Sequence, residues 1–325
     1  MRIVFMGTPE LAVASLEALL KSEDQVVGVV TQPDRPKGRG QTLAASPIKQ
    51  VALREGLPLL QPVKMKDPVF LDALRAWQPD LIAVTAFGRI LPPVILSLPP
   101  RGCINVHGSL LPKYRGAGPI QWAIIKGEQE TGITTMLMDE GMDTGPMLLQ
   151  ERVPILPEDT AGTLSVKLAE VGGRLLVETI RRLHAGTLTP QPQDHSKATL
   201  APLLKKEDGL ITWTASATDI ANRIRGLSPW PGAYAYARGE RWVLSRASAA
   251  DASSSRAGGA TPGTVVEVRK DALLIATGQG LLAIREFQPA NSRRMTVAQY
   301  LAGHTVAPGL MLGPGPEVGQ GTDAE

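Results

Sequence analysis

Short apolar runs alternate with amphipathic stretches along the first half of the chain. The runs at 2–6, 25–31, 57–60, 80–86 and 102–106 are rich in Val, Ile and Leu, which is typical of strands covered on both faces. The stretches between and after them repeat apolar residues at helical spacing near residue 10 and at 46–54, 67–77 and 117–126. Strands that alternate with helices predict an α/β domain with a Rossmann-like, mostly parallel sheet.

The turn after the first run predicts a helix start, with Thr8 as its N-cap and Pro9 in its first position. This turn lacks the spaced glycines of a dinucleotide-binding loop, and no acidic residue closes the strand 25–31. A nicotinamide-dependent dehydrogenase is therefore not expected. Sheets of this kind bind ligands outside the carboxyl ends of their strands. The stretch 105–112 follows one such strand and is the candidate site.

The pattern changes after a long predicted helix at 160–184, which closes the first domain, 1–184. Strands at 132–138 and 147–154 precede that helix, and residues 185–204 lack periodicity and read as a linker. A short helix at 217–225 and several brief strands then predict a smaller β-barrel, OB-like domain over 205–310. These strands are expected at 233–237, 242–247, 263–268, 272–276 and 281–287. Residues 249–260 read as an Ala/Ser/Gly loop, and the tail 311–325 is expected to lack order.

Charge is distributed unevenly between the predicted domains. Residues 1–204 carry 21 basic and 20 acidic side chains, whereas residues 205–310 carry 13 basic and 8 acidic ones, a net charge of +5. A basic second domain is compatible with a polyanionic partner.

The single cysteine excludes an internal disulfide and a zinc site built from several cysteines. The four histidines show no metal-ligand spacing, so we expect no metal. We expect neither a signal peptide nor a membrane span, and hence a cytoplasmic protein. Nothing in the sequence requires more than a monomer.

Candidate chemistry lies in Asn105-Val-His107. Side chains two residues apart on a strand share a face, so an amide and an imidazole project together and can polarise a carbonyl and handle a proton. A second segment, 139–146, carries Asp143 between two glycines that let its backbone bend around a ligand. It could bring a carboxylate to the imidazole. Cys103 shares the same parity, so a thiol nucleophile and a buried apolar side chain both remain open for it.

These motifs resemble the folate-dependent formyltransferases. The N-x-H-x-SLLP stretch at 105–112 and the D-x-G-x-D-T-G-P stretch at 139–146 carry the resemblance. A closer match to the branch of the family that formylates the methionine on initiator tRNA lies in four further segments, at 5–9, 31–40, 201–209 and 225–232. Gly108 stands where Ala is also familiar, and the loop 249–260 and the acidic tail look like additions.

The resemblance implies formyl transfer from 10-formyltetrahydrofolate, as co-substrate, to the α-amino group of methionyl-initiator tRNA, for translation initiation. The first domain would bind folate and the second would help to hold tRNA. Glycinamide ribonucleotide or an amino sugar nucleotide remain alternative acceptors. A non-catalytic folate- or RNA-binding module and a folate hydrolase are further alternatives.

The resemblance also implies roles for individual residues. Asn105, His107 and Asp143 would form the catalytic set. The residues expected to contact folate are Ser109, Leu110, Leu111, Pro112, Arg89, Leu91, Asp139, Glu140, Gly141 and Met142. Arg35, Lys37 and Arg39 would enter the acceptor stem of the tRNA, as arginines pair with phosphates and base edges.

Overall fold

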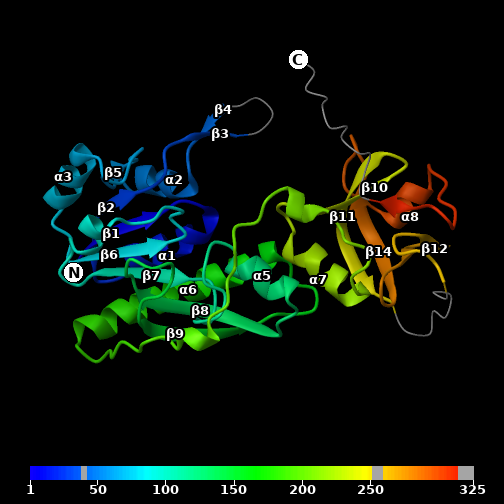
Figure 1. Ribbon diagram of the computed structural model, residues 1–325. Coiled ribbons are helices and arrows are strands. Elements are labelled where there is room, and N and C mark those ends of the chain that lie inside the picture. Colours follow the sequence, from blue (N-terminus) through cyan, green and yellow to red (C-terminus); the bar gives the residue numbers. More distant parts are fainter. Residues whose placement is uncertain (38–41, 251–258, 314–325) are drawn as a thin grey trace, which may run out of the picture. The chain divides into compact units, whose positions relative to one another are not determined.

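The computed structural model describes residues 1–37, 42–250 and 259–313. The chain forms two compact units (Figure 1). The first consists of residues 1–120, 129–156 and 163–203, and the second of residues 121–128, 157–162 and the chain from 204 onward. Among the described residues, no helix is both long and apolar enough to span a bilayer.

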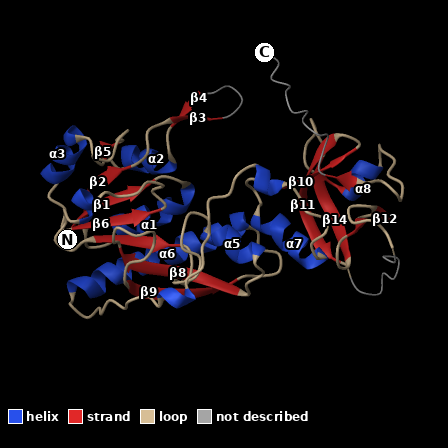
Figure 2. Cartoon of the chain, viewed as in Figure 1, coloured by secondary structure: helices blue, strands red, loops and turns tan. Residues whose placement is uncertain are grey.

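The first unit is built on a seven-stranded sheet in the order β5-β2-β1-β6-β7-β8-β9 (Figure 2). The strands are β1 (Arg2–Gly7), β2 (Gln25–Val30), β5 (Leu59–Leu60), β6 (Leu81–Thr85), β7 (Cys103–His107), β8 (Glu130–Leu137) and β9 (Met147–Pro154). The five strands from β5 to β7 run parallel, whereas β8 and β9 add to the edge as antiparallel strands. The expected mostly parallel α/β fold is therefore confirmed.

Helices cover both faces of this sheet because its central strands are apolar on both sides. The helices of the first half are α1 (Val13–Leu20), α2 (Pro47–Arg54), α3 (Pro68–Ala76), α4 (Pro93–Leu96) and α5 (Pro119–Ile125), followed by α6 (Ala161–His184). Leu74 of α3 and Ile95 of α4 pack in one buried cluster with Cys103 of β7. On the other face, Gly172 of α6 lies directly against Val106.

The segment after β1 differs from the expected helix start. A 3₁₀ turn, η1 (Glu10–Ala12), precedes α1, and no side chain caps it. Thr8 instead donates its hydroxyl to the carbonyl oxygen of Phe87 at 3.1 Å, which ties the β1 turn to the loop after β6. The Thr8 hydroxyl therefore makes a tertiary hydrogen bond, and Thr8 does not cap the helix as the local sequence pattern predicted.

The second unit is a curled antiparallel sheet in the order β12-β13-β14-β11-β10-β16, with β15 paired to β14. Its strands are β10 (Ala233–Ala237), β11 (Glu240–Ala249), β12 (Val265–Val268), β13 (Leu273–Ala276), β14 (Leu281–Gln288), β15 (Met295–Thr296) and β16 (Leu312–Gly313). Backbone hydrogen bonds join Val265 to Leu310 and Gly309 at 2.8 Å, so the two ends of the sheet meet and the expected barrel-like domain is confirmed.

The barrel interior is apolar. Small residues alternate inward along β10, and Trp242 stacks on Phe287 with ring centroids 4.5 Å apart. Helices α7 (Ala217–Gly226) and α8 (Val297–Leu301) contribute Ile220, Ile224 and Val297 to the same core. The barrel includes Leu312–Gly313, beyond the boundary at 310 that the pattern suggested. Most of the loop 249–260 and all but the first residues of the tail lie outside the described residues.

Candidate active site

Asn105 and His107 lie near the end of β7, the strand where the sheet changes from parallel to antiparallel pairing. β7 pairs parallel with β6 and antiparallel with β8. Because alternate strand residues project from the same face, the amide and the imidazole stand side by side. His107 is only 5% exposed and Asn105 is partly exposed. The strand therefore holds a buried imidazole next to an amide that a ligand can reach.

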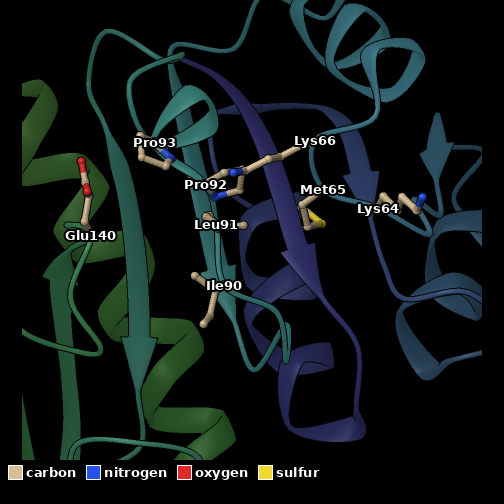
Figure 3. A pocket seen from close by; sticks show the side chains of 8 residues that line it. All are labelled: Lys64, Met65, Lys66, Ile90, Leu91, Pro92, Pro93 and Glu140. Carbon is tan, nitrogen blue, oxygen red and sulfur yellow. The ribbon is translucent and has the colours of Figure 1, made fainter.

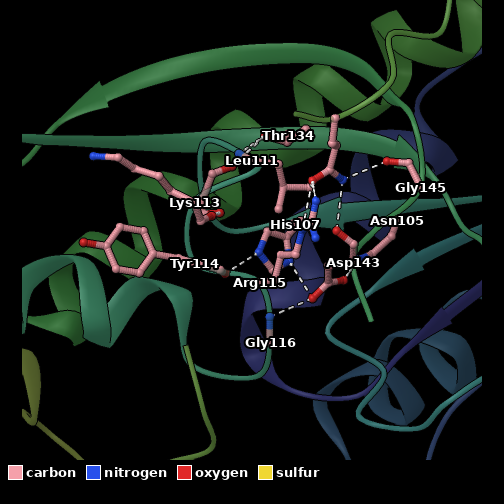
Figure 4. A network of polar contacts seen from close by, with 12 residues as sticks. Asn105, His107, Leu111, Lys113, Tyr114, Arg115, Gly116, Thr134, Asp143 and Gly145 are labelled. Atoms are coloured by element: carbon pink, nitrogen blue, oxygen red, sulfur yellow. Dashed lines mark hydrogen bonds and ion pairs between the residues drawn. The ribbon is translucent and has the colours of Figure 1, made fainter. Parts of the chain in front are cut away.

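Asp143 lies in the connection between β8 and β9 and contacts both residues (Figure 4). Its Oδ1 accepts a hydrogen bond from Asn105 Nδ2 at 3.3 Å, and its Oδ2 accepts one from the Gly116 backbone N–H at 2.9 Å. The same Oδ2 lies 3.6 Å from His107 Nδ1. The carboxylate is thus the atom group that links the amide, the imidazole and the loop after β7.

The backbone of Asp143 adopts a left-handed conformation, with φ of 54°. Such a conformation is uncommon for a residue with a side chain, although Asp tolerates it better than most, and it tends to occur at functional sites. Gly145 follows, and a Cβ there would lie 1.9 Å from the Leu137 carbonyl oxygen. The tight bend that the glycine allows turns the Asp143 carboxylate towards β7.

The imidazole of His107 has a defined tautomer. Its Nε2 lies 2.9 Å from the Tyr114 carbonyl oxygen, which can only accept a hydrogen bond, so Nε2 carries the hydrogen. Nδ1 then faces the Asp143 carboxylate. A proton taken up by the ring would be held at Nδ1, next to that carboxylate.

The loop 109–112 is held by its own polar contacts. The Ser109 hydroxyl donates to the Lys113 carbonyl at 2.6 Å, and the Leu111 N–H donates to Thr134 Oγ1 at 3.1 Å. Ser109 is 0% exposed and Leu111 is 3% exposed. A ligand could therefore meet this loop through the partly exposed Leu110 and Pro112, while the serine hydroxyl is committed to the loop itself.

A cleft of about 500 Å³ opens beside the 86–96 segment (Figure 3). It contains two of the residues named from sequence, Leu91 and Glu140. The sequence did not single out its other lining residues, which are Lys64, Met65, Lys66, Ile90, Pro92 and Pro93. The lysines lie on the side of the cleft opposite Glu140, with the apolar Ile90–Pro93 segment between them.

The folate candidates Arg89, Asp139, Gly141 and Met142 are close in sequence to residues that line this cleft. The Arg89 guanidinium donates to the Val63 carbonyl at 2.7 Å and so joins the two loops that line the cleft. Asp139 accepts hydrogen bonds from the Gly141 N–H at 3.1 Å and from the Thr144 hydroxyl at 2.7 Å. Met142 is 61% exposed on the same loop. Arg89 and Asp139 are thus occupied by intramolecular contacts, whereas Met142 is available to a ligand.

The basic segment expected to contact tRNA begins as a short antiparallel hairpin rather than an irregular loop. Its strands are β3 (Arg35–Lys37) and β4 (Thr42–Ala44). The exposed Arg35 donates from Nη2 to Gln32 Oε1 at 2.7 Å. Lys37 belongs to β3, and Arg39 lies outside the described residues.

Cys103 is buried behind the site. It is 1% exposed, and this burial raises the pKa of its thiol to about 12. A thiol in that state has almost no thiolate at neutral pH and cannot act as a nucleophile.

We expect Cys103→Ala to keep kcat within about twofold of wild type. The variant should lose roughly 1 kcal/mol of unfolding free energy, because the smaller side chain leaves a cavity. Steady-state rates and thermal unfolding check this. A tenfold drop in kcat in a folded variant would contradict it.

Three residues that complete the site were not found from sequence. Tyr114 and Gly116 hold the imidazole and the carboxylate through backbone groups, to which any residue type contributes. Gln193 donates from Nε2 to the Asp143 carbonyl oxygen at 2.9 Å. It lies in the segment read as a linker, where no periodicity marks it. Within the described part of the chain, no cluster of three or more His, Cys, Asp or Glu side chains could hold a metal ion.

Both units match models of known protein families. Residues 1–180 match the formyl transferase family and residues 203–305 match the formyl transferase C-terminal domain.

Relatives match along almost the whole chain. A methionyl-tRNA formyltransferase from Desulfotalea psychrophila is 53% identical over 312 residues, which are 96% of this chain and 95% of the relative. A methionyl-tRNA formyltransferase from Myxococcus xanthus is 48% identical over 308 residues, 95% of this chain and 96% of the relative.

Solved structures share the fold at low sequence identity. WlaRD, a sugar 3N-formyl transferase solved in the presence of dTDP and 5-N-formyl-THF, superposes with a TM-score of 0.65 at 19% identity, over 90% of this chain and 99% of its own. HypX from Aquifex aeolicus in complex with tetrahydrofolic acid has a TM-score of 0.60 at 19% identity, over 93% of this chain and 47% of its own. With its two matching family models and its full-length relatives, this chain belongs to the formyltransferase family, in the branch of the methionyl-tRNA formyltransferases.

Proposed function

We propose that this protein transfers the formyl group of 10-formyltetrahydrofolate to the α-amino group of methionyl-initiator tRNA. The observation that carries the proposal is the junction of the Asn105 amide, the His107 imidazole and the Asp143 carboxylate. The choice of acceptor is supported by relatives named methionyl-tRNA formyltransferase, which are about 50% identical to this chain over nearly its full length. We further propose that the protein is a monomer and that it acts in the cytoplasm.

The cleft beside β6 suits the folate co-substrate. Its volume of about 500 Å³ lies in the range of small-molecule sites, and its apolar wall from Ile90 to Pro93 can cover flat rings. Lys64 and Lys66 can meet the carboxylates of the glutamyl part. When bound, the co-substrate supplies a one-carbon acyl group to an amine. Within the proposal, Leu110, Pro112 and the residues from Asp139 to Met142 border it.

Asn105 is proposed to stabilise the negative charge that develops on the formyl oxygen. Its amide has two hydrogens, and Asp143 Oδ1 holds one of them at a donor–acceptor distance of 3.3 Å. That contact fixes the amide and leaves the other hydrogen for the oxyanion. A donor fixed in advance stabilises the transition state more than one that must first reorient.

His107 and Asp143 are proposed to pass the proton that the attacking amine loses to N10 of the folate, the nitrogen that leaves when its bond to the formyl carbon breaks. Nε2 of the ring is engaged by the Tyr114 carbonyl, so Nδ1 is the atom that can exchange a proton. Asp143 Oδ2, 3.6 Å away, can accept a hydrogen bond from a protonated Nδ1. The Gly116 N–H on the same oxygen keeps the carboxylate in place.

The direct test follows the label of [¹⁴C]formyl-tetrahydrofolate offered with charged initiator tRNA, charged elongator tRNA, glycinamide ribonucleotide or no acceptor. We expect label on the methionine of initiator tRNA. Label on glycinamide ribonucleotide would overturn the acceptor assignment. Release of labelled formate without any acceptor would indicate a folate hydrolase, and folate binding without turnover would indicate a binding module.

A tRNA acceptor also predicts a steep salt dependence. Residues 205–310 carry a net charge of +5, and exposed arginines such as Arg293 can neutralise phosphates. We expect KM for tRNA to rise about tenfold or more between 50 and 200 mM salt, because counterions compete for the phosphate contacts. KM for the formyl donor serves as the control and should change far less. A KM for tRNA that does not change with salt concentration would contradict the assignment of a polyanionic acceptor.

A further inference from the structure

The segment that follows α6 is part of the site rather than a free connection. The backbones of Gln191 and Met147 exchange two hydrogen bonds of 2.8 Å, which attach the segment to the start of β9. Further along, Arg115 donates its N–H to Thr199 O at 2.8 Å and accepts from the Ala201 N–H at 2.7 Å. The segment therefore runs from the Asp143 loop to the loop after β7, and it is bonded to the first unit at both ends.

Gln193 lies between these two attachment points and uses its whole amide. Nε2 donates to the carbonyl oxygens of Asp143 at 2.9 Å and Gly145 at 2.8 Å. Oε1 accepts from Arg115 Nε at 3.0 Å and Nη2 at 2.6 Å. Gln193 and Arg115 are both 6% exposed, so these contacts are shielded from water. A buried amide that satisfies both donors and its acceptor in one geometry constrains all of its partners.

The partners of Gln193 belong to two loops that contact the catalytic residues. One is the Asp143 loop, with its left-handed residue. The other carries Arg115, which lies between Tyr114 and Gly116, the residues whose backbone groups hold the imidazole and the carboxylate. A Cβ at Gly116 would lie 2.7 Å from Ala201 O, so this loop is also in close contact with the segment after α6. Gln193 thus joins the two loops that set the position of one carboxylate.

We propose that Gln193 is a positioning residue for formyl transfer, which holds the Asp143 carboxylate within reach of Asn105 and His107 without touching substrate. The proposal rests on the proposed function and deepens it. Removal of the amide donors would release the carbonyls of Asp143 and Gly145, and with them the backbone bend that aims the carboxylate. Because a displacement of about 1 Å can cost about 10²-fold in rate, the effect should appear in kcat.

The test compares two charge-matched variants. Gln193→Glu keeps an acceptor for the buried Arg115 but replaces the donors by an oxygen that faces two carbonyls. Gln191→Glu makes the same change at an exposed position of the same segment, where the side chain has no described role. We expect Gln193→Glu to lower kcat by about 10–100-fold with both KM values within about twofold of wild type. Gln191→Glu should match wild type.

A double-mutant cycle with Asp143→Ala separates positioning from general destabilisation. If Gln193 acts through the carboxylate, Gln193→Glu should lower the single-turnover rate by no more than about twofold once Asp143 is alanine. Residues that act as a unit lose their effects non-additively, whereas a purely structural change would multiply with the first loss. Single-turnover rates with enzyme in excess keep the slow variants measurable.

The outcomes distinguish this proposal from the assigned function. If wild type does not formylate methionyl-tRNA, or if Asp143→Ala keeps its rate, the proposed function or its catalytic set fails. If both hold but Gln193→Glu equals Gln191→Glu, only the positioning role fails. Full additivity in the cycle would also overturn that role. If Gln193→Glu raises KM and leaves kcat unchanged, Gln193 contributes to binding and the proposal is wrong.

Discussion

Replacement of Asp143 by asparagine is expected to lower kcat by about 10²–10⁴-fold while KM for both substrates stays close to wild type. The two carboxylate oxygens both accept hydrogen bonds, one from Asn105 Nδ2 and one from the Gly116 N–H. Asparagine has one oxygen and one NH₂ group, so it must set a donor against a donor at one of these positions. It also removes the negative charge beside His107 Nδ1, where we place the mobile proton.

This substitution changes almost no volume, so its effect should be chemical. Thermal unfolding of the variant should remain near that of wild type. Glu151→Gln supplies the matched control, because Glu151 is a partly exposed carboxylate of β9 in an ion pair with Arg174. We expect full activity from that variant. An Asp143→Asn enzyme with wild-type kcat would remove the carboxylate from the mechanism.

Asn105→Ala is the second large effect and should lower kcat by about 10²–10³-fold, the usual loss for one oxyanion donor. The amide does two things in the proposed site: it donates to Asp143 and it offers its other hydrogen to the formyl oxygen. The oxyanion exists only along the reaction path. Loss of the Asn105 donor should therefore reduce kcat and kcat/KM together and leave KM unchanged.

Asn105→Asp tests the same point by replacing the neutral amide donor with a negatively charged group that only accepts hydrogen bonds. The variant keeps the shape but sets a second carboxylate beside Asp143 and offers no amide donor, so we expect a loss at least as large as that of alanine. Rapid-quench single-turnover rates isolate the formyl-transfer step from product release. If Asn105→Ala raised KM for the formyl donor without lowering the transfer rate, Asn105 would bind substrate only.

The alternation of apolar runs and amphipathic stretches was sufficient to predict the sheet of the first unit. A strand buried on both faces needs an unbroken apolar run, and a helix over it needs a stripe at 3.6-residue spacing, so both leave local signatures. Some short elements left no such signature. The two-residue strand β16 and the helix α4 are shorter than any window in which periodicity can be read. Thr8 shows that local sequence patterns are limited in another way. Its hydroxyl donates to the distant Phe87 carbonyl instead of capping the expected helix.

The candidate site shows where local sequence stops being informative. Asn105 and His107 belong to one strand, so parity alone put them on the same face. Asp143 comes from a hairpin 38 residues from Asn105, and only the register of β8 against β7 brings it there. The family resemblance assigned the catalytic carboxylate to Asp143 and folate contacts to Asp139 and Glu140. In the structure, Asp139 accepts a hydrogen bond from Thr144 of its own loop, and Glu140 lines the cleft.

By itself, the sequence of this protein determined its two-part architecture and the strand that carries the amide and imidazole. It could do so because these properties depend on patterns within a few residues. Only the tertiary structure showed that the Asp143 carboxylate lies beside the imidazole, which ring nitrogen is left to hold a proton, and that Gln193 joins the two loops around them. Several of the contacts in this site are made by backbone groups, such as the Tyr114 carbonyl and the Gly116 N–H, which almost every residue type carries and no sequence pattern can mark.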